Sequence, residues 1–117
     1  MARAAFNAFC AALPATTHVV QWGGADVWKV GGKVFAIAGW NHGADAYTFK
    51  VSDLAFEVLP DMPGLRPAPY MASRGLKWVQ LYDDPGLSDV ALKEHLCASY
   101  DMVVSGLTRR IRTDLNI

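Results

Sequence analysis

Apolar positions recur at helical spacing near both ends of the chain. In the first segment, Phe6, Phe9, Cys10 and Leu13 are separated by 3, 1 and 3 residues and predict an amphipathic helix over residues 2–13. In the last segment the apolar positions are Leu92, Leu96, Tyr100, Val103, Leu107 and Ile111. They predict one long helix with Ser88 as its N-cap. Both stripes are expected to pack against the same face of a sheet.

Two glycines mark the clearest local structure, a β-hairpin. Gly31 and Gly32 separate two β-rich runs, residues 27–30 and 33–38, and a two-residue turn of this kind requires positive φ. The expected register sets Trp28 opposite Phe35. The core face of the hairpin would carry Trp28, Val30, Phe35 and Ile37, and the outer face Val27, Lys29, Val34, Ala36 and Ala38.

Three further strands and a short helix complete the predicted order of elements. The strands are expected at residues 16–22, 46–51 and 77–82, and the helix over residues 53–59 with Ser52 as its N-cap. The order α-β-β-β-β-α-β-α, with tight turns between the middle strands, predicts a mostly antiparallel sheet with its helices on one face. The whole chain, residues 1–117, is expected to form a single two-layer α+β domain.

The composition is that of a folded domain, and it bears on where in the cell the protein is expected. Hydrophobic residues make up 52% of the chain and charged residues 19%, which is typical of globular proteins. No apolar run is long enough for a transmembrane helix. The first fifteen residues also allow a signal peptide, but their spacing favours the amphipathic helix. Cys10 and Cys97 form no motif, so we expect reduced thiols in a cytoplasmic protein; a disulfide between them is the alternative.

A candidate surface lies in residues 66–82, where positive charge and aromatic groups alternate. Arg66, Arg74 and Lys77 supply the charge, and Tyr70 and Trp78 supply the aromatic surface. In the strand that follows, Val79 and Leu81 form the natural core pair, so Trp78 and Gln80 point to the other face. Two explanations fit Trp78: a neighbouring loop or helix covers it, or it contributes to binding.

The usual signatures of catalysis, metal binding and phosphate binding are missing from the sequence. Gly23–Gly24 and Gly31–Gly32 do not precede helices, as a phosphate-binding loop would require. The histidines, at positions 18, 42 and 95, lack the spacing of zinc ligands. No Ser/His/Asp or Cys/His set is suggested by a motif. We therefore expect no enzyme activity, no cofactor and no metal.

Several segments, taken in order, resemble the MmcQ/YjbR family of small bacterial proteins with a CyaY-like (frataxin-like) fold. The matching segments are WKVGGKVFA at residues 28–36, FKVSDLAFEVL at 49–59, GLRPAPY at 64–70, KWVQL at 77–81 and ASYDMVVSGL at 98–107. Family members commonly have His before the Trp of the fifth strand and an Asn-Lys pair shortly before it. Here Lys77 and the tripeptide Ala72-Ser73-Arg74 stand in those places.

The resemblance implies a CyaY-like fold and, for the family as a whole, a DNA-binding role through a double-wing arrangement of hairpins. The frataxin-like fold also suggests an iron role, which would need an acidic ridge on the first helix. Residues 2–13 contain no Asp or Glu, so we do not expect iron binding.

Two hypotheses of function follow for this protein, for which we expect no membrane partner and favour a monomer. The first is weak, non-specific DNA binding by a surface formed from Lys29, Lys50, Arg66, Arg74, Lys77 and Trp78. Eleven basic residues balance eleven acidic ones, which does not favour tight binding to nucleic acid. The alternative is a protein- or small-ligand-binding domain that uses the same open sheet face. Its contacts would be Val34, Ala36, Ala38 and Trp78, with Thr48 and Gln80 as polar anchors.

Overall fold

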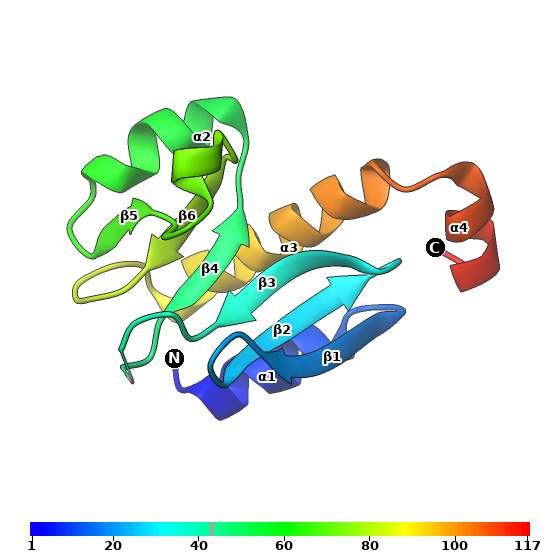
Figure 1. Cartoon of the computed structure of the whole chain (residues 1–117), viewed down its shortest axis with the longest axis horizontal. Helices are drawn as coiled ribbons and strands as arrows, with labels where there is room; N and C mark the ends of the chain where they lie inside the picture. The colour runs from blue at the N-terminus through cyan, green and yellow to red at the C-terminus, as the bar shows by residue number, and fades with distance from the viewer. Residues whose placement is uncertain (43) are drawn as a thin grey trace.

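A six-stranded antiparallel sheet in the order β1-β2-β3-β4-β6-β5 forms the centre of the molecule (Figure 1). The structure, a computed structural model, describes residues 1–42 and 44–117, apart from the side chain of residue 72. The elements are α1 (Arg3–Ala12), β1 (Thr16–Gln21), β2 (Ala25–Val30), β3 (Lys33–Ala38), β4 (Tyr47–Lys50), α2 (Asp53–Val58), the 3-10 turn η1 (Leu59–Asp61), β5 (Leu65–Pro67), the 3-10 turn η2 (Ala72–Arg74), β6 (Trp78–Leu81), α3 (Asp89–Ser105) and α4 (Arg109–Leu115). The predicted α+β class with an antiparallel sheet is confirmed.

One face of the sheet, here called the helix face, is covered by α1 and α3, which lie behind the strands in Figure 1. The main core lies between these layers and includes Phe6 and Leu96 from the helices and Phe35, Phe49 and Val79 from the strands. A hydroxyl joins the layers: Ser99 Oγ donates to the carbonyl of Phe35 at 2.6 Å and accepts from the amide of Lys50 at 2.9 Å. The predicted stripes therefore pack where expected.

The hairpin turn forms as predicted, but the register changes farther from the turn. Gly31 and Gly32 have φ of 59° and 78°, and Val30 pairs with Lys33. A β-bulge between Trp28 and Lys29 then pairs Trp28 with Ala36 instead of Phe35.

The bulge corrects the predicted faces of the hairpin. One extra residue on a strand moves the following side chains to the opposite face, because side chains alternate with a period of two. Ile37, expected in the main core, therefore belongs to a second cluster with Ala25 and Val27. Ala36 and Ala38, expected on the outer face, belong to the main core.

The predicted last helix is in fact two helices. α3 ends at Ser105 with Gly106 at its C-cap, and Thr108 starts α4 by accepting a hydrogen bond from the amide of Ile111. Gly disfavours a helix interior, and Thr favours an N-cap, which explains the break. Arg109 and Arg110 thus begin a separate short helix.

The structure also contains a strand that the sequence pattern did not predict. β5 lies at the edge of the sheet, where Pro67 pairs with Val79. A proline cannot donate a hydrogen bond to the neighbouring strand, but an edge strand tolerates it.

The predicted N-caps are confirmed: Ser52 Oγ accepts from Ala55 N at 3.2 Å and Ser88 Oγ from Ala91 N at 3.1 Å. Within the described residues, none of the helices has the length and apolar character needed to cross a membrane.

Candidate functional site

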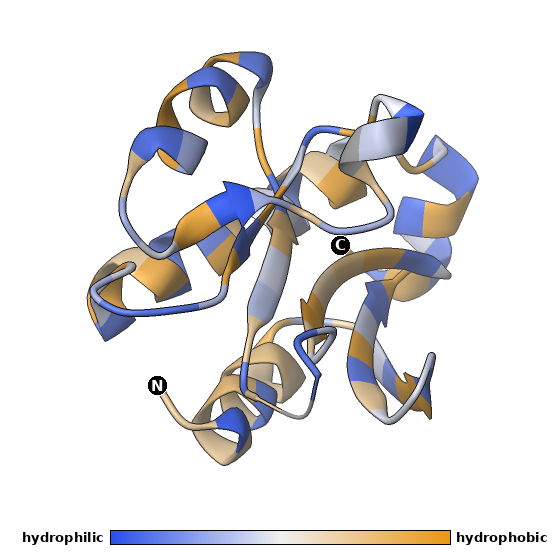
Figure 2. Ribbon diagram, turned by 60° about the vertical axis from the view of Figure 1, so that its left-hand side comes forward, coloured by the Kyte–Doolittle hydropathy of each residue, from blue (hydrophilic) through white to orange (hydrophobic). Residues whose placement is uncertain are grey.

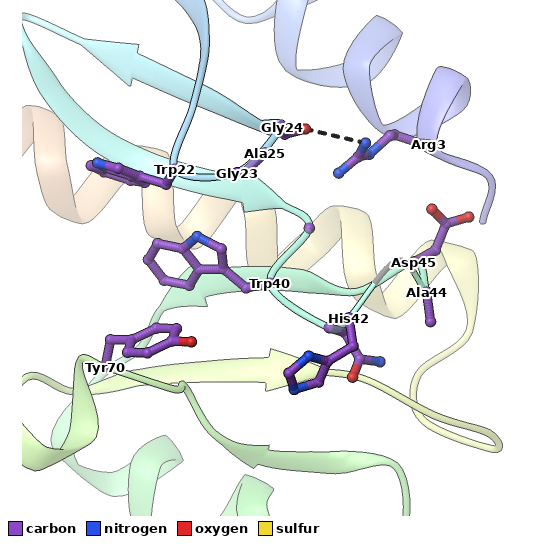
Figure 3. A pocket seen from close by; sticks show the side chains of 12 residues that line it. Arg3, Trp22, Gly23, Gly24, Ala25, Trp40, His42, Ala44, Asp45 and Tyr70 are labelled. Atoms are coloured by element: carbon purple, nitrogen blue, oxygen red, sulfur yellow. Dashed lines mark hydrogen bonds between the residues drawn. The ribbon is translucent and has the colours of Figure 1, made fainter.

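The second face of the sheet, here called the loop face, carries a smaller apolar cluster and a group of aromatic side chains. Ala25, Val27 and Ile37 form the cluster, and Trp40 and Met71 pack against it. Trp22 follows β1, Trp40 follows β3, and Tyr70 precedes η2. Three connecting segments, distant in sequence, therefore bring their aromatic side chains together over this face (Figure 3).

The three aromatic rings touch in a row. The ring centroids of Trp22 and Trp40 are 5.4 Å apart with planes at 40°, and those of Trp40 and Tyr70 are 5.6 Å apart with planes at 82°. Beside this row is an open hollow of about 470 Å³, here called the aromatic cleft, which is lined by Trp22, Trp40, Tyr70, Met71, Arg74 and Leu76. Its volume lies in the range of about 300–1,000 Å³ that is typical of small-molecule sites.

Backbone conformation sets these aromatic residues apart from ordinary surface residues. Trp22, Trp40 and Tyr70 have φ of 53°, 66° and 68°, in the left-handed region that bulky residues rarely adopt. His42, in the same loop as Trp40, has φ of 46°. Left-handed conformations cost about 1–3 kcal/mol each and cluster at binding and catalytic sites. Three such residues around one hollow single it out as the candidate site.

Trp22 and Tyr70 also remain exposed despite their apolar bodies. Trp22 is 50% exposed and Tyr70 is 72% exposed. Exposed aromatic groups that lie together are typical of interaction surfaces rather than of random surface residues. The cleft therefore offers stacking surface to a ligand.

A second hollow of about 280 Å³, here called the polar hollow, lies on the other side of the aromatic row. Its lining includes Arg3, Gly24, His42 and Asp45, and Figure 3 shows Arg3 and Asp45 across the hollow from the three rings. The Arg3 guanidinium is already engaged, because Nη2 donates to Ala38 O at 2.7 Å and Nε lies 3.3 Å from Asp26 Oδ2. Arg3 thus attaches α1 to the sheet and is not free to bind an anion.

The Asp26 carboxylate contacts both Arg3 and His18 where α1 is attached to the sheet. His18 Nε2 lies 2.7 Å from Asp26 Oδ1, and Arg3 contacts the other carboxylate oxygen. Burial alone would raise the pKa of Asp26. The hydrogen bonds from His18 and Asn7 and the charge of Arg3 outweigh burial and hold the pKa of Asp26 below its ordinary value.

A buried polar chain holds the backbone that carries Trp40. Gln80 is completely buried; its Nε2 donates to the carbonyls of Gly39 and Trp40 at 3.4 and 3.3 Å. Its Oε1 accepts from Arg66 Nε at 2.8 Å, and the Arg66 guanidinium lies 4.2 Å from the centroid of the Tyr82 ring. Gln80 and the partly buried Arg66 therefore hold the loop that carries Trp40.

The residues of the nucleic-acid hypothesis have different surroundings in the structure. Arg74 lines the aromatic cleft, whereas Arg66 belongs to the polar chain. The Nζ of Lys77 lies 4.7 Å from the centroid of the Phe56 ring. Lys29 and Lys50 lie partly buried on β2 and β4. Trp78 is only 7% exposed, so the first explanation, that the surrounding structure covers it, describes this side chain.

Most residues of the apolar patch in the alternative hypothesis are buried and do not form an open surface. Ala36 and Ala38 lie in the main core, and Thr48 and Gln80 are completely buried. Val34 packs against the second cluster. An apolar binding surface does exist, but its residues are those of the aromatic cleft.

Sequence patterns missed Trp22 and Trp40, although a weak signal was present. Trp22 precedes Gly23 and Gly24, and Trp40 follows Gly39. Each bulky side chain therefore lies next to a glycine turn whose formation does not require an aromatic residue. Figure 2 shows the connecting loops mostly in hydrophilic or neutral colours. A hydropathy scale overlooks such a site because it ranks Trp and Tyr as weakly hydrophilic.

Potential metal ligands and thiols are distributed as follows in the part of the chain that the structure describes. Within residues 1–42 and 44–117, no group of three or more His, Cys, Asp and Glu side chains is placed to hold a metal ion. Cys10 and Cys97 are free thiols. Burial raises the pKa of Cys10 to about 12, which keeps this thiol protonated and unreactive at neutral pH.

Comparisons with known proteins agree with this fold. The YjbR family model matches residues 11–102. The uncharacterized protein YbdF of Escherichia coli O157:H7 is 29% identical over 87 residues, which covers 73% of this chain and 69% of that protein. The crystal structure of Deinococcus radiodurans protein DR2400, a DUF419 domain, superposes with a TM-score of 0.81 at 22% identity and covers 96% of this chain and 86% of that one. The chain therefore belongs to the YjbR family.

Proposed function

We propose that this protein is a non-enzymatic, cytoplasmic binding module whose contact surface is the aromatic cleft. The single observation that carries the proposal is the row of three aromatic side chains in left-handed conformations. Selection for stability alone would favour glycine or a small polar residue at such positions. A bulky ring that is both strained and exposed is better explained by what it binds.

The lining of the cleft favours a flat apolar group as the bound species. Trp22 and Tyr70 expose ring surface, and Met71 and Leu76 extend the apolar lining. Stacking of a planar group on such rings replaces water on both surfaces and favours offset or edge-to-face geometry. Since no pair of acidic or basic groups lines the cleft, we assign it binding and not catalysis.

Single-stranded DNA is the second candidate, because bases are flat and Arg74 stands beside the rings. Bases can stack on exposed aromatic side chains while a guanidinium contacts a phosphate. Arg74 is the one charged side chain in the described lining of the cleft, so we expect about one phosphate contact there. The slope of log affinity against log salt should then be about −0.7, far shallower than a surface of four or more cations would give.

The proposal can be tested by titrating the protein with indole and with a thymidine decanucleotide at two salt concentrations. We expect indole to bind, with an affinity independent of salt. Trp22→Ala should weaken indole binding by about 5- to 150-fold, which corresponds to the loss of roughly 1–3 kcal/mol of stacking. Val90→Ala, which removes an exposed apolar side chain on α3, serves as the matched control and should bind as the parent does.

The same titration separates the two candidates. Decanucleotide binding that is tighter than indole binding and steeply salt-dependent would favour the DNA function. Absence of binding to both probes by the folded parent, or equal binding by parent and Trp22→Ala, would contradict the assignment of the cleft.

A further inference from the structure

Among the described side chains that line the aromatic cleft, Arg74 is the one that carries a charge. Its side chain is exposed at the end of η2. No ion pair joins it to an acidic side chain in the described part of the chain. Arg3 differs in this respect, because its guanidinium is paired with the Asp26 carboxylate. Arg66 donates to the neutral Gln80 and does not line the cleft. Arg74 is thus the available cation at the cleft.

A guanidinium in this position has defined chemical preferences. Its planar fork of N–H donors matches the two oxygens of a carboxylate or the oxygens of a phosphate. A ligand that stacks on Trp22 and Tyr70 would place a substituent at its edge within reach of residues that border the rings, such as Arg74. A cationic substituent there would meet like charge, and a neutral one would leave the guanidinium hydrated.

The one charged side chain in the described lining of the cleft also limits the charge of the ligand. A strand of nucleic acid presents a phosphate at every nucleotide and requires several cations along its path. Lys77, the next basic residue along the chain, is directed to the Phe56 ring, and Arg66 is engaged by Gln80. One anionic group, and not a row of them, complements this site.

We propose that the ligand of the aromatic cleft is a small free molecule with a flat aromatic body and one anionic substituent, which Arg74 binds. This inference rests on the proposed function, since it assigns the ligand class of the same cleft. The volume of about 470 Å³ accommodates a fused two-ring body with a short acidic side chain.

Three probes of one shape test the charge preference: indole-3-acetate, indole-3-acetamide and tryptamine. Their ring is constant, and the substituent is anionic, neutral or cationic. Affinities are measured by NMR titration of the isotope-labelled protein. We expect the anion to bind the parent about 3- to 10-fold more tightly than the amide, a modest factor because Arg74 is exposed, and the cation to bind most weakly.

Substitutions of Arg74 test whether this residue causes the preference for the anionic ligand. Arg74→Gln should reduce the affinity for indole-3-acetate about 3- to 10-fold and leave that for the amide within about twofold. Arg74→Lys, which keeps the charge, should restore part of the preference. Arg110→Gln in α4, at the far end of the molecule in Figure 1, is the matched control and should behave as the parent does.

The outcomes distinguish this inference from the proposed function. Equal affinity of the parent for anion and amide, or an anion preference that survives in Arg74→Gln, would overturn the inference while the cleft remains a binding site. Tighter binding of the thymidine decanucleotide than of indole-3-acetate would overturn it in favour of a polyanion. Failure of all three indoles to bind the folded parent would overturn the proposed function itself.

Discussion

The two faces of the sheet are covered in different ways. On the helix face, α1 and α3 lay regular apolar stripes over the strands, and the large side chains Phe6, Phe35 and Phe49 are completely buried. On the loop face, irregular segments cover a cluster of only three buried apolar residues. Their aromatic side chains stay half or more exposed at Trp22 and Tyr70. The first face resembles an ordinary core, and the second combines a small core with a strained, open surface.

This difference suggests a division between stability and function. The helix face is packed by the regular helices α1 and α3, so local preference and tertiary contacts agree there. The loop face places bulky residues where the backbone disfavours them, which costs stability that the helix face must supply. Substitutions on the two faces should therefore have different consequences, in the following order of size.

The largest loss of stability is expected on the helix face. Phe49→Ala removes a completely buried ring that stacks on His95 at a centroid distance of 5.3 Å. The free energy of unfolding should fall by about 3–5 kcal/mol, as for other deletions of buried aromatic groups. Denaturant unfolding measures it. A loss below about 1 kcal/mol would show that this face is not the main core.

A smaller but clear loss is expected at the hairpin turn, where the helix face meets α4. Gly31 has φ of 59°, and a Cβ there would lie 2.6 Å from Leu107 Cδ1. Gly31→Val should cost about 2–5 kcal/mol through unfavourable φ and overpacking. The matched control is Gly32→Val, because Gly32 has φ of 78° but nothing within 4 Å. The control should cost only about 1–2 kcal/mol, and equal losses would refute the contact with Leu107.

A substitution in the polar chain that supports Trp40 should lower the stability by an intermediate amount and should also weaken ligand binding. Gln80→Leu leaves Arg66 Nε and the Trp40 carbonyl without the partners they have now, at a cost of about 1–3 kcal/mol. A double-mutant cycle with Arg66→Met should give a loss smaller than the sum of the single losses. The indole affinity should fall as well, since the Trp40 loop loses its support. Strictly additive losses would contradict a shared network.

Acid should weaken the attachment of α1 to the sheet through Asp26. The pKa of Asp26 in the folded protein lies below its ordinary value of 3.8. The stabilising contribution of its carboxylate is therefore fully present above about pH 4 and is lost as the pH falls through the folded pKa. Asp26→Asn should remove this part of the pH dependence of the unfolding free energy. Parallel stability profiles for parent and variant below pH 4 would contradict it.

The smallest effect on stability, with a clear effect on binding, is expected at Tyr70. Its side chain is 72% exposed with φ of 68°, so Tyr70→Gly loses little buried area and relieves left-handed strain. The loss of the contact with Trp40 offsets part of that gain, and the net change should stay within about 1 kcal/mol. The affinity for indole-3-acetate should nevertheless fall. A variant that binds as tightly as the parent would show that Tyr70 is not part of the site.

The sequence predicted the features that depend on neighbouring residues. Gly31 and Gly32 specify a turn, and Ser52 and Ser88 specify N-caps, because each acts on the backbone next to it. The bulge beside Trp28 depends on packing across strands, so the pattern of alternation placed Ile37 on the wrong face. The break between α3 and α4 was missed because the apolar stripe continues past it through Leu107 to Ile111.

The candidate site was predicted only in part because it is assembled from separate loops. Residues 66–82 drew attention for their charge and aromatic content, and two of them, Tyr70 and Arg74, do line the cleft. Trp22 and Trp40 come from other connections, and no local pattern links them. Trp78 could not be placed from alternation alone, since the period of a strand gives a face and not what covers it.

The four tryptophans provide the most direct test of the central claim that the aromatic cleft is the binding surface. Trp22 and Trp40 line the cleft, whereas Trp28 donates from Nε1 to Asn7 Oδ1 at 2.9 Å and Trp78 is buried. Their indole N–H signals can be followed separately by NMR while indole-3-acetate is added. The signals of Trp22 and Trp40 should move with a shared saturation curve while those of Trp28 and Trp78 stay in place. Saturable shifts confined to Trp28 or Trp78, or four signals that do not move, would contradict the claim.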